Sequence, residues 1–279
     1  MPYRQGDPVV SPEWLQARLG DPQLRVVDCR FNLFEPGWGY QQYRNGHIPG
    51  AHFVDLDRDL AAPPARPGGR HPLPSPEAFA ASMRRIGLNP EDTVVAYDQD
   101  GQGAARLWWL LQYFGHLQAF VLDGGWPGWL ASGGPVSLEV PSAPPGRFEP
   151  HPDPEMVVDH EGVLRSAQVC CLVDARSPER FRGEQDPLDQ PAGHIPGAIN
   201  LTWSQFLREG RYKSGAELRA EFGDRFDPGR EVVVYCGSGV SACIDVVGLR
   251  RMGIAPKLYP GSWSDWVSRD GLPIATGEE

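Results

Sequence analysis

The sequence contains little cysteine, and its cysteines are not arranged like those of a disulfide framework or a zinc site. There are five, an odd number, in a chain of 279 residues: Cys29, Cys170, Cys171, Cys236 and Cys243. A chain of this length can bury a hydrophobic core without disulfide support. No CxxC pair occurs, so we expect no bound metal. The remaining question is which thiol, if any, is activated.

The sequence also lacks long hydrophobic runs and an excess of positive charge. No stretch approaches the ~18 apolar residues of a membrane helix. The first seven residues, MPYRQGD, contain no apolar segment typical of a signal peptide, so we expect a cytoplasmic protein without membrane contact. The net charge of −10 argues against nucleic acid and anionic membranes as partners. An anionic substrate would have to be attracted by a few local cations and backbone amides.

What the sequence does contain is an internal repeat. The block GHIPGA at 46–51 returns at 193–198, 147 residues later. Two further blocks recur in the same order: VVDCR at 26–30 with LVDAR at 172–176, and DGGW at 123–126 with PGSW at 260–263. The offset shortens along the chain, as it would if two homologous halves had loops of different length. The sequence therefore predicts a duplicated fold.

A proline-rich stretch between residues 135 and 154 separates the two halves. Such a composition cannot form a helix and is typical of an extended linker. The length of the chain also suggests about two domains. We predict an N-terminal domain over 1–140, a linker over 141–155 and a C-terminal domain over 156–279.

Each half alternates short apolar strands with helices. The expected strands are Leu24–Asp28, Thr93–Tyr97 and Ala119–Leu122 in the first half, and Cys170–Asp174, Glu231–Tyr235 and Lys257–Tyr259 in the second. Their β-branched composition favours buried parallel strands. Ser-Pro-Glu at 11–13, 75–77 and 177–179 predicts helix starts, with serine as N-cap and proline in the first turn. We therefore expect an α/β fold with a small, mainly parallel sheet flanked by helices in each half.

The loop after the predicted strand 231–235 carries the most informative pattern. Cys236 is followed by GSGVSA and then by an apolar helix. Ligands of open α/β sheets bind where strands end and helices begin. The glycines allow the backbone to fold tightly around the sulfur, so that consecutive N–H groups point at an anion. A free thiol with a pKa of ~8.5 is only about 3% ionised at pH 7, so several converging donors would favour the thiolate.

The equivalent position in the first half differs. Tyr97-Asp98 aligns with Tyr235-Cys236, and a carboxyl group cannot act as a sulfur carrier. We therefore expect the first half to be catalytically inactive and the second half to be active.

Taken together, the duplicated halves, the GHIPGA blocks and the loop after Cys236 resemble the tandem-domain rhodanese family, which comprises thiosulfate and 3-mercaptopyruvate sulfurtransferases. The resemblance covers nearly the whole chain and implies two tandem rhodanese-like domains. It also implies that Cys236 takes sulfur from a small anionic donor as a persulfide and passes it to cyanide, a thiol or a thioredoxin-like acceptor, with no cofactor. Gly237, Gly239, Val240 and Ser241 would then help to hold the donor.

The resemblance implies roles for further residues. Arg180 is similar to the arginine that anchors the substrate, and its N–H fork suits a carboxylate or a sulfonate-like anion. Trp263 is expected to wall the pocket and exclude water. His71 and Asp57 resemble a pair found in some mercaptopyruvate-type enzymes. A neutral His71 imidazole would relay a proton through Ser238 while Asp57 fixes its tautomer.

The identity of the donor stays open, because the sequence departs from both patterns. Leu188 stands about where mercaptopyruvate enzymes often carry a second arginine. Gly237 and Ser238 stand where animal-type thiosulfate enzymes carry arginine and lysine, although a serine there matches the mercaptopyruvate-type loop. Both donors therefore remain candidates.

Other functions for a reactive cysteine fit the sequence less well. A cysteine phosphatase needs an arginine six residues after its nucleophile, where this chain has Ala242. No local signature of a cysteine protease is present. His47 and His194 recur in both halves, so we interpret them as structural. The main alternative to an enzyme is a non-catalytic rhodanese-fold module that binds a partner or senses sulfur.

Overall fold

The computed structural model describes residues 6–166 and 169–278, and its contacts divide the chain into two units. Unit 1 consists of the chain up to Ala62, Pro74–Asp153 and Glu209–Tyr212. Unit 2 consists of Pro63–Leu73, Pro154–Arg208 and the chain from Lys213 onward. Each unit thus includes a short segment from the other half of the sequence. The segment 63–73 in particular belongs with the second half.

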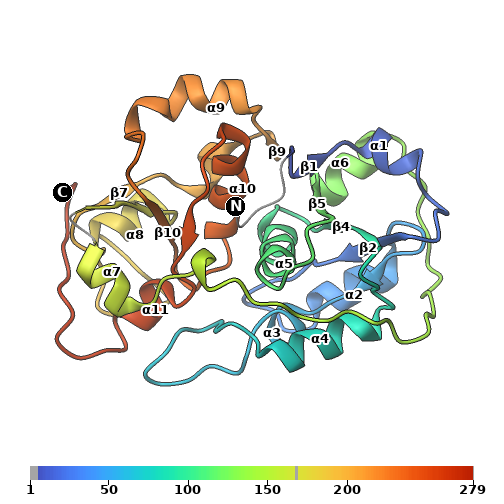
Figure 1. Ribbon diagram of the computed structural model, residues 1–279, viewed down its shortest axis with the longest axis horizontal. Helices are drawn as coiled ribbons and strands as arrows, with labels where there is room; N and C mark the ends of the chain where they lie inside the picture. Colours follow the sequence, from blue (N-terminus) through green and yellow to red (C-terminus); the bar gives the residue numbers. More distant parts are fainter. Residues whose placement is uncertain (1–5, 167–168, 279) are drawn as a thin grey trace. The chain divides into compact units, whose positions relative to one another are not determined.

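Unit 1 is built on a five-stranded parallel sheet in the order β1-β5-β4-β2-β3 (Figure 1). Its strands are β1 (Val9–Val10), β2 (Leu24–Asp28), β3 (His52–Phe53), β4 (Thr93–Tyr97) and β5 (Ala119–Leu122), and it also includes β9 (Arg211–Tyr212). Its helices are α1 (Pro12–Gln16), α2 (Trp38–Asn45), α3 (Leu56–Asp59), α4 (Pro76–Arg85), α5 (Gln102–Tyr113) and α6 (Gly125–Ala131). Helix α5 packs on β4 and β5.

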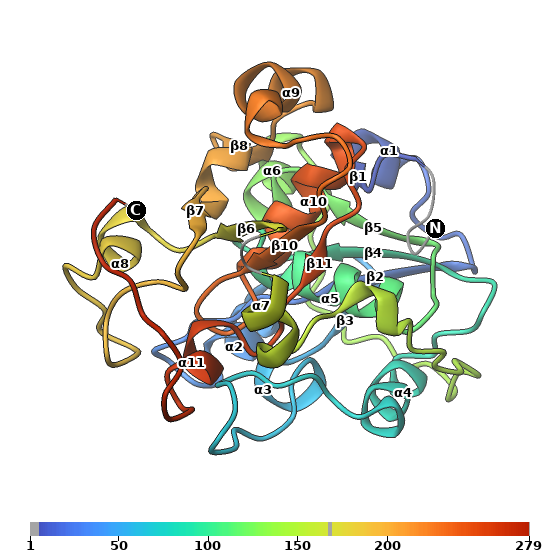
Figure 2. The same cartoon turned by 60° about the vertical axis from the view of Figure 1, so that its left-hand side comes forward.

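Unit 2 has a four-stranded parallel sheet in the order β11-β10-β6-β7 (Figure 2). Its strands are β6 (Cys171–Asp174), β7 (Ala198–Asn200), β8 (Leu207–Arg208), β10 (Val232–Tyr235) and β11 (Lys257–Leu258). Its helices are α7 (His160–Ser166), α8 (Pro178–Arg182), α9 (Gly215–Phe222), α10 (Ala242–Met252) and α11 (Ser262–Trp266), with 3-10 turns η1 (Pro154–Met156), η2 (Trp203–Phe206) and η3 (Gly223–Arg225). The prediction of an α/β fold with a small parallel sheet in each half is confirmed.

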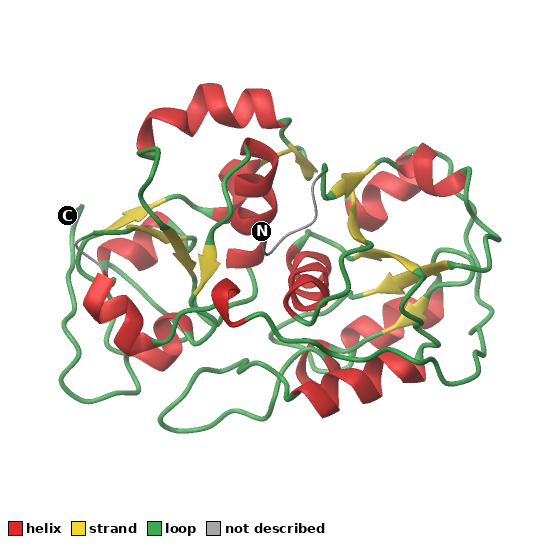
Figure 3. Ribbon diagram, in the orientation of Figure 1, coloured by secondary structure: helices red, strands yellow, loops and turns green. Residues whose placement is uncertain are grey.

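The helix starts follow from local chemistry. The Ser75 hydroxyl accepts a hydrogen bond from the Ala78 N–H at 3.1 Å, and the Ser11 hydroxyl accepts one from the Trp14 N–H at 3.2 Å. Both side chains satisfy an N–H group that has no partner within the first helical turn. Helix α8 begins after Ser177 as predicted, with Pro178 at its first position but without a side-chain cap bond. Long loops join these short elements (Figure 3).

The repeated sequence blocks correspond to a repeated ion-pair arrangement. In unit 2, the Arg176 guanidinium binds Asp174 at 2.6 Å and the Gly193 carbonyl at 2.6 Å. Its carbon also lies 4.6 Å from the centre of the Trp263 ring. Unit 1 repeats this arrangement with Asp28, Arg30, Gly46 and Trp126. Each Asp-x-Arg block therefore ties the end of a central strand to the GHIPGA block.

This packing defines the surroundings of Trp263. The side chain is fully buried in the core of unit 2, beneath Arg176, and has no exposed surface. Its ring lies against the guanidinium of Arg176, and a role in walling the substrate pocket stays a sequence-based prediction. The large size of tryptophan correctly indicated burial, but it did not distinguish a core position from a pocket wall.

The two recurring histidines are likewise held inside their units. His47 Nδ1 lies 2.7 Å from the Tyr43 carbonyl, and His194 Nδ1 lies 2.8 Å from the Phe181 carbonyl. Each imidazole also stacks on the ring of the same partner residue. These contacts account for their recurrence without a catalytic role. None of the helices in the described parts of the chain has the length and apolar character needed to cross a membrane.

Candidate active site

Cys236 lies at the carboxyl end of β10, between the central strand of unit 2 and helix α10. Its N–H donates to the Ser262 hydroxyl at 3.1 Å, and its carbonyl accepts from the Trp263 N–H at 2.9 Å. The Gly237 carbonyl accepts from the Ser264 N–H at 2.9 Å. The first turn of α11 therefore fixes the backbone on which the thiol is carried.

Main-chain and hydroxyl donors converge on the Cys236 sulfur. The Gly239 N–H donates to Sγ at 3.1 Å. Burial opposes ionisation of this thiol, but hydrogen bonds from the Ser241 side chain and from the N–H groups of Ala242, Ser238 and Gly239 outweigh it and lower the pKa. These donors form what we call the sulfur cradle. Only about 1% of Cys236 is exposed, so water is largely excluded from the sulfur.

Gly239 makes the cradle possible. Its φ of +75° lies in the left-handed region that favours glycine. A Cβ atom at this position would lie 2.4 Å from the Pro260 carbonyl oxygen, closer than any real contact. The glycine pattern in the sequence thus has a specific steric cause.

Unit 1 has an equivalent loop that holds a carboxyl group. Asp98 accepts hydrogen bonds from the N–H groups of Gly101 at 2.7 Å, Gly103 at 2.6 Å and Ala104 at 3.2 Å. Burial and the nearby charge of Asp100 raise the pKa of Asp98 to about 8, against the opposing effect of the N–H donors. The loop is therefore formed in both units, but only unit 2 carries a thiol in it.

Two arginines lie over the loop beside Cys236. A methyl group built on Gly237 would lie 2.9 Å from Arg70 Nη2 and 3.1 Å from Arg180 Nη2. Both side chains also bind Asp189: Arg70 Nη1 binds Oδ1, and Arg180 Nη2 binds Oδ2 at 3.1 Å. Arg180 Nε binds Asp186 at 3.0 Å. Two guanidinium groups therefore face the same glycine of the active loop.

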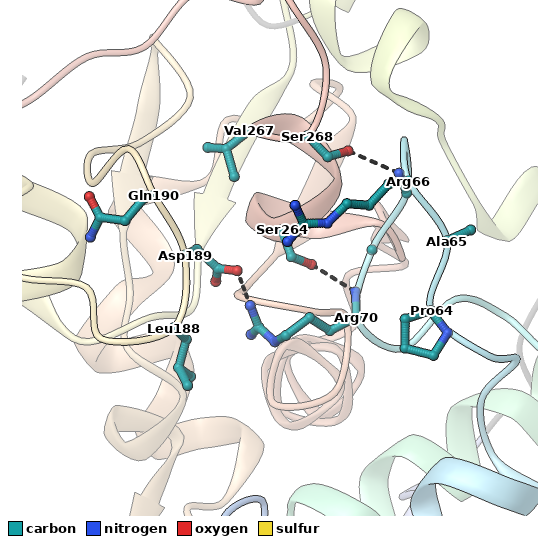
Figure 4. Close-up of a pocket in the computed structure, with 12 residues that line it drawn as sticks. Pro64, Ala65, Arg66, Arg70, Leu188, Asp189, Gln190, Ser264, Val267 and Ser268 are labelled. Carbon is teal, nitrogen blue, oxygen red and sulfur yellow. Dashed lines mark hydrogen bonds and ion pairs between the residues drawn. The ribbon is translucent and has the colours of Figure 1, made fainter.

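A cavity of about 500 Å³ opens beside these side chains. In Figure 4, Arg70 and Asp189 point toward one another across it. It is lined by the segments 64–70 and 188–190 and by Ser264, Val267 and Ser268 of unit 2. Arg70 lines this cavity, whereas Arg180 and Cys236 do not.

The segment 63–73 also brings a histidine to the cradle. His71 is buried, and its Nδ1 lies 2.8 Å from the Ser238 hydroxyl oxygen. The backbone of this segment is anchored on α11 and the residues after it, because the Arg70 N–H donates to the Ser264 hydroxyl at 3.1 Å and the Gly68 N–H donates to the Ser268 hydroxyl at 2.9 Å. The predicted proximity of His71 and Ser238 thus has a structural basis.

The other predicted site residues have different settings. Val240 is buried in the loop, and Ser241 immediately precedes α10. Asp57 lies at an exposed position on α3 in unit 1, and its partnership with His71 stays a sequence-based prediction. Among the described residues, no group of three or more His, Cys, Asp or Glu side chains is arranged to hold a metal ion.

Sequence reasoning missed Arg70, Asp186 and Asp189 as parts of this site. Their charges alone gave no signal, because charged residues are common in exposed loops. One available signal was the immediate adjacency of Arg70 to His71 in a Gly/Pro-rich loop. If His71 is placed at the active loop, its neighbour must lie close to it.

The chain is similar to proteins of known class. The Rhodanese-like domain matches residues 11–132 and again 160–269. A probable 3-mercaptopyruvate sulfurtransferase of Pseudomonas aeruginosa is 43% identical, with 97% of this chain and 98% of that protein covered. A putative thiosulfate sulfurtransferase, SseB of Mycobacterium tuberculosis, is 40% identical, with 93% of each chain covered.

The comparison with solved structures also identifies a sulfurtransferase. The crystal structure of SseA from Escherichia coli, a 3-mercaptopyruvate sulfotransferase with the rhodanese fold, aligns with a TM-score of 0.80 at 34% identity. The alignment covers 92% of this chain and 99% of SseA. The similarity therefore extends over both halves and includes the overall architecture.

Proposed function

Because this chain belongs to the rhodanese family and is a sulfurtransferase, we propose that it carries sulfur as a persulfide on Cys236. The donor is 3-mercaptopyruvate or thiosulfate, and the acceptor is cyanide or a thiol, including the thiol of a thioredoxin-like protein. The observation that carries this proposal is the sulfur cradle, which directs several donors at one buried thiol and lowers its pKa. The same donors can stabilise the terminal sulfur of a persulfide, which is also anionic.

The first half-reaction loads the sulfur. With mercaptopyruvate, the Cys236 thiolate attacks the donor sulfur, an S–S bond forms and the carbon–sulfur bond breaks. The electron pair remains on carbon as the enolate of pyruvate, which must gain a proton. With thiosulfate, the thiolate attacks the outer sulfur, and sulfite leaves with the electron pair without needing a proton. Burial of Cys236 protects the persulfide from water during the interval.

A proton path for the mercaptopyruvate reaction is available at Ser238. Its hydroxyl lies 2.8 Å from His71 Nδ1, so the pair can pass a proton between the donor thiol and the enolate carbon. We propose that His71 and Ser238 relay this proton and that Asp57 orients the imidazole. Arg180 is proposed to hold the anionic end of the donor, as its position over Gly237 allows.

The second half-reaction unloads the sulfur. The acceptor thiolate or cyanide attacks the terminal sulfur, the S–S bond breaks and the thiolate of Cys236 is restored to the cradle. We propose that the equivalent loop of unit 1 carries no sulfur, because Asp98 occupies the position of the thiol. This division assigns the sulfur-carrying thiol to the C-terminal range predicted at 156–279, with 1–140 as a copy that carries no sulfur and 141–155 as the linker between them.

The test is the covalent intermediate. Treatment of the full chain with either donor should add about 32 Da, localised to Cys236, and an acceptor thiol should remove it. A Cys236→Ser variant should show neither the mass shift nor turnover, whereas Cys243→Ser in α10, the helix that follows the loop, serves as the matched control. Full turnover by Cys236→Ser would refute the proposal. Absence of loading in the wild-type chain would favour the alternative of a binding or sulfur-sensing module.

A further inference from the structure

Helix α10 carries a buried carboxyl group immediately after the sulfur cradle. Asp245 lies in the first turn of this helix, which begins at Ala242, one of the cradle donors. The side chain is fully buried, and neither carboxyl oxygen has a hydrogen-bond partner within the described part of the chain. Helical side chains lean toward the N-terminus of their helix, so Asp245 is directed toward the end of α10 that follows Cys236.

The copy of this helix in unit 1 shows that the fold does not require a carboxyl group at this position. The offset of 138 residues that relates Asp98 to Cys236 also relates the N–H donors of the two loops. The same offset places Leu107 of α5 at the position of Asp245, and Leu107 is also fully buried. A buried polar group without a partner is costly, whereas a buried leucine stabilises the fold. A carboxyl group kept only in the unit that holds the thiol points to a role in the chemistry of that thiol.

The charges that act most strongly on Asp245 are negative. Burial, followed by the charges of Cys236 and Asp174, raises the pKa of Asp245 well above its usual value, and the opposing effect of its own N–H is smaller. Asp174 is paired with Arg176 at 2.6 Å, which leaves Cys236 as the main charge to consider. The titratable side chains on the other elements that pack on α10 have partners elsewhere: Glu217 with Arg208, Arg219 with the Arg251 and Met252 carbonyls, Glu221 with Lys213, Tyr235 with the Ile195 N–H, and Lys257 with Glu231.

We propose that Asp245 is a positioning residue that confines the negative charge of the active loop to the Cys236 sulfur: it keeps its proton while the sulfur is ionised, and its own ionisation at alkaline pH stops the loading of anionic donors. This inference rests on the proposed function. While Asp245 holds its proton, the loop contains a single negative charge, and the cradle donors place it on sulfur. When the carboxyl group ionises, a second buried negative charge repels the incoming donor, which is itself an anion. Asp245 thus acts through Cys236 and sets an upper pH limit for sulfur loading.

The experiment compares the full wild-type chain with Asp245→Asn, which has nearly the same shape but cannot ionise. Loading of Cys236 is followed by the mass shift in a single turnover from about pH 6 to about pH 10, with thiosulfate and, in a second arm, mercaptopyruvate. The two proteins should load within about twofold of each other at neutral pH. Above the pH at which Asp245 ionises, the wild-type rate should fall relative to the variant by about tenfold per pH unit. A change in the charge of the donor cancels in this ratio, because both proteins meet the same donor.

Two further measurements distinguish this charge effect from a structural one. Alkylation of Cys236 by iodoacetamide, a neutral reagent, should keep the ratio of the two proteins' rates within about threefold over the same pH range, because a neutral reagent is not repelled. The infrared difference spectrum between the wild type and Asp245→Asn should contain the C=O stretch of a protonated carboxyl group at neutral pH. This band should disappear over the pH range in which wild-type loading falls.

Two further variants complete the comparison. Asp270→Asn is the matched control, because Asp270 is an exposed residue of unit 2 and the substitution removes the same charge. It should show the pH dependence of the wild type and no protonated carboxyl band at neutral pH. Asp245→Val is a second variant that cannot ionise, and its loading should depend on pH as that of Asp245→Asn does. If Asp245→Asn does not fold, the valine variant carries the comparison.

The outcomes are distinct. A loading ratio that stays constant over the whole pH range overturns the inference, and so does the absence of the carboxyl band at neutral pH. An equal fall in loading and alkylation of the wild type also overturns it, because that result would indicate loss of structure. In each of these cases a wild-type chain that loads at neutral pH leaves the proposed function intact. If the wild-type chain cannot be loaded at Cys236 at any pH, the proposed function fails and the inference about Asp245 fails with it.

Discussion

The N–H of Gly103 donates a 2.6 Å hydrogen bond to Oδ2 of Asp98, which places a carboxyl group where unit 2 holds its thiol. The two loops thus share a construction but bind different groups. In unit 1, burial dominates and raises the pKa of Asp98 to about 8. In unit 2, the donors outweigh burial and lower the pKa of Cys236. This contrast leads to the first prediction.

Asp98→Asn should change how stability depends on pH. The pKa of Asp98 is about 8 in the folded protein and ~3.9 for an unperturbed aspartate. The folded state therefore retains a proton that the unfolded state loses, and this contribution to stability falls as pH rises from about 4 to 8. The melting temperature of the wild type relative to Asp98→Asn should decrease over this range and level off above it. A difference that stays constant from pH 5 to 9 would contradict the raised pKa.

Ser238→Ala should affect the two donors unequally. The mercaptopyruvate reaction must deliver a proton to the enolate, whereas sulfite leaves thiosulfate without one. We expect the rate of loading from mercaptopyruvate to fall about 100-fold or more and the rate from thiosulfate to change little. His71→Asn should give the same pattern, and the double variant should lose little more than either single one, because the two residues are in contact. Equal losses with both donors would exclude a proton relay.

Gly239→Ala should disrupt the cradle. The substitution strains a backbone with φ of +75° and places a methyl group 2.4 Å from the Pro260 carbonyl oxygen. Persulfide loading should be lost, and the free energy of unfolding should fall by more than about 1 kcal/mol. Gly253→Ala is the matched control, since its φ is +89° with no atom within 4 Å of the added methyl group. It should be destabilised by strain alone and still load sulfur, and loss of loading in both variants would argue against a specific role for Gly239.

Asp245 offers a way to stabilise the protein. It is fully buried on α10, and neither carboxyl oxygen has a hydrogen-bond partner among residues 6–166 and 169–278. Burial, followed by the charges of Cys236 and Asp174, raises its pKa well above the usual value. Asp245→Val removes the unsatisfied oxygens and should stabilise the fold by about 1–3 kcal/mol at pH 8. Asp245→Asn leaves the polar atoms of its amide unpaired, so its free energy of unfolding should increase by less than that of Asp245→Val. Denaturant unfolding of the three proteins provides the measurement, and a destabilised valine variant would show that the carboxyl group is needed.

The parts of the fold that depend on local sequence were predictable. Thr93–Tyr97 forms β4 with the predicted bounds, because a short β-branched run favours a buried parallel strand. Glu231 and Tyr259 lie just outside the observed strands, as expected for strand ends, which local pattern defines poorly. The Cys236 loop was recognisable because its glycines meet a steric requirement within a few residues.

The parts that depend on tertiary packing were not predictable in the same way. The placement of Arg70 beside Gly237 depends on hydrogen bonds to side chains almost 200 positions later in the chain. Nothing in its own neighbourhood specifies that contact. Trp263 gives a second example, because its position against Arg176 depends on the direction in which α11 presents the side chain. Burial can be inferred from composition, but orientation needs the assembled fold.

The exchange of segment 63–73 has a consequence for dissecting the protein. A fragment that starts at the proline-rich stretch keeps Cys236 and its amide donors, but it leaves behind Arg70 and His71. Such a fragment cannot be treated as a self-sufficient half, even though the chain carries the signature of duplication. Exchanging halves between related proteins would likewise separate Arg70 and His71 from the Cys236 loop. The two halves arose by duplication, but they are no longer interchangeable.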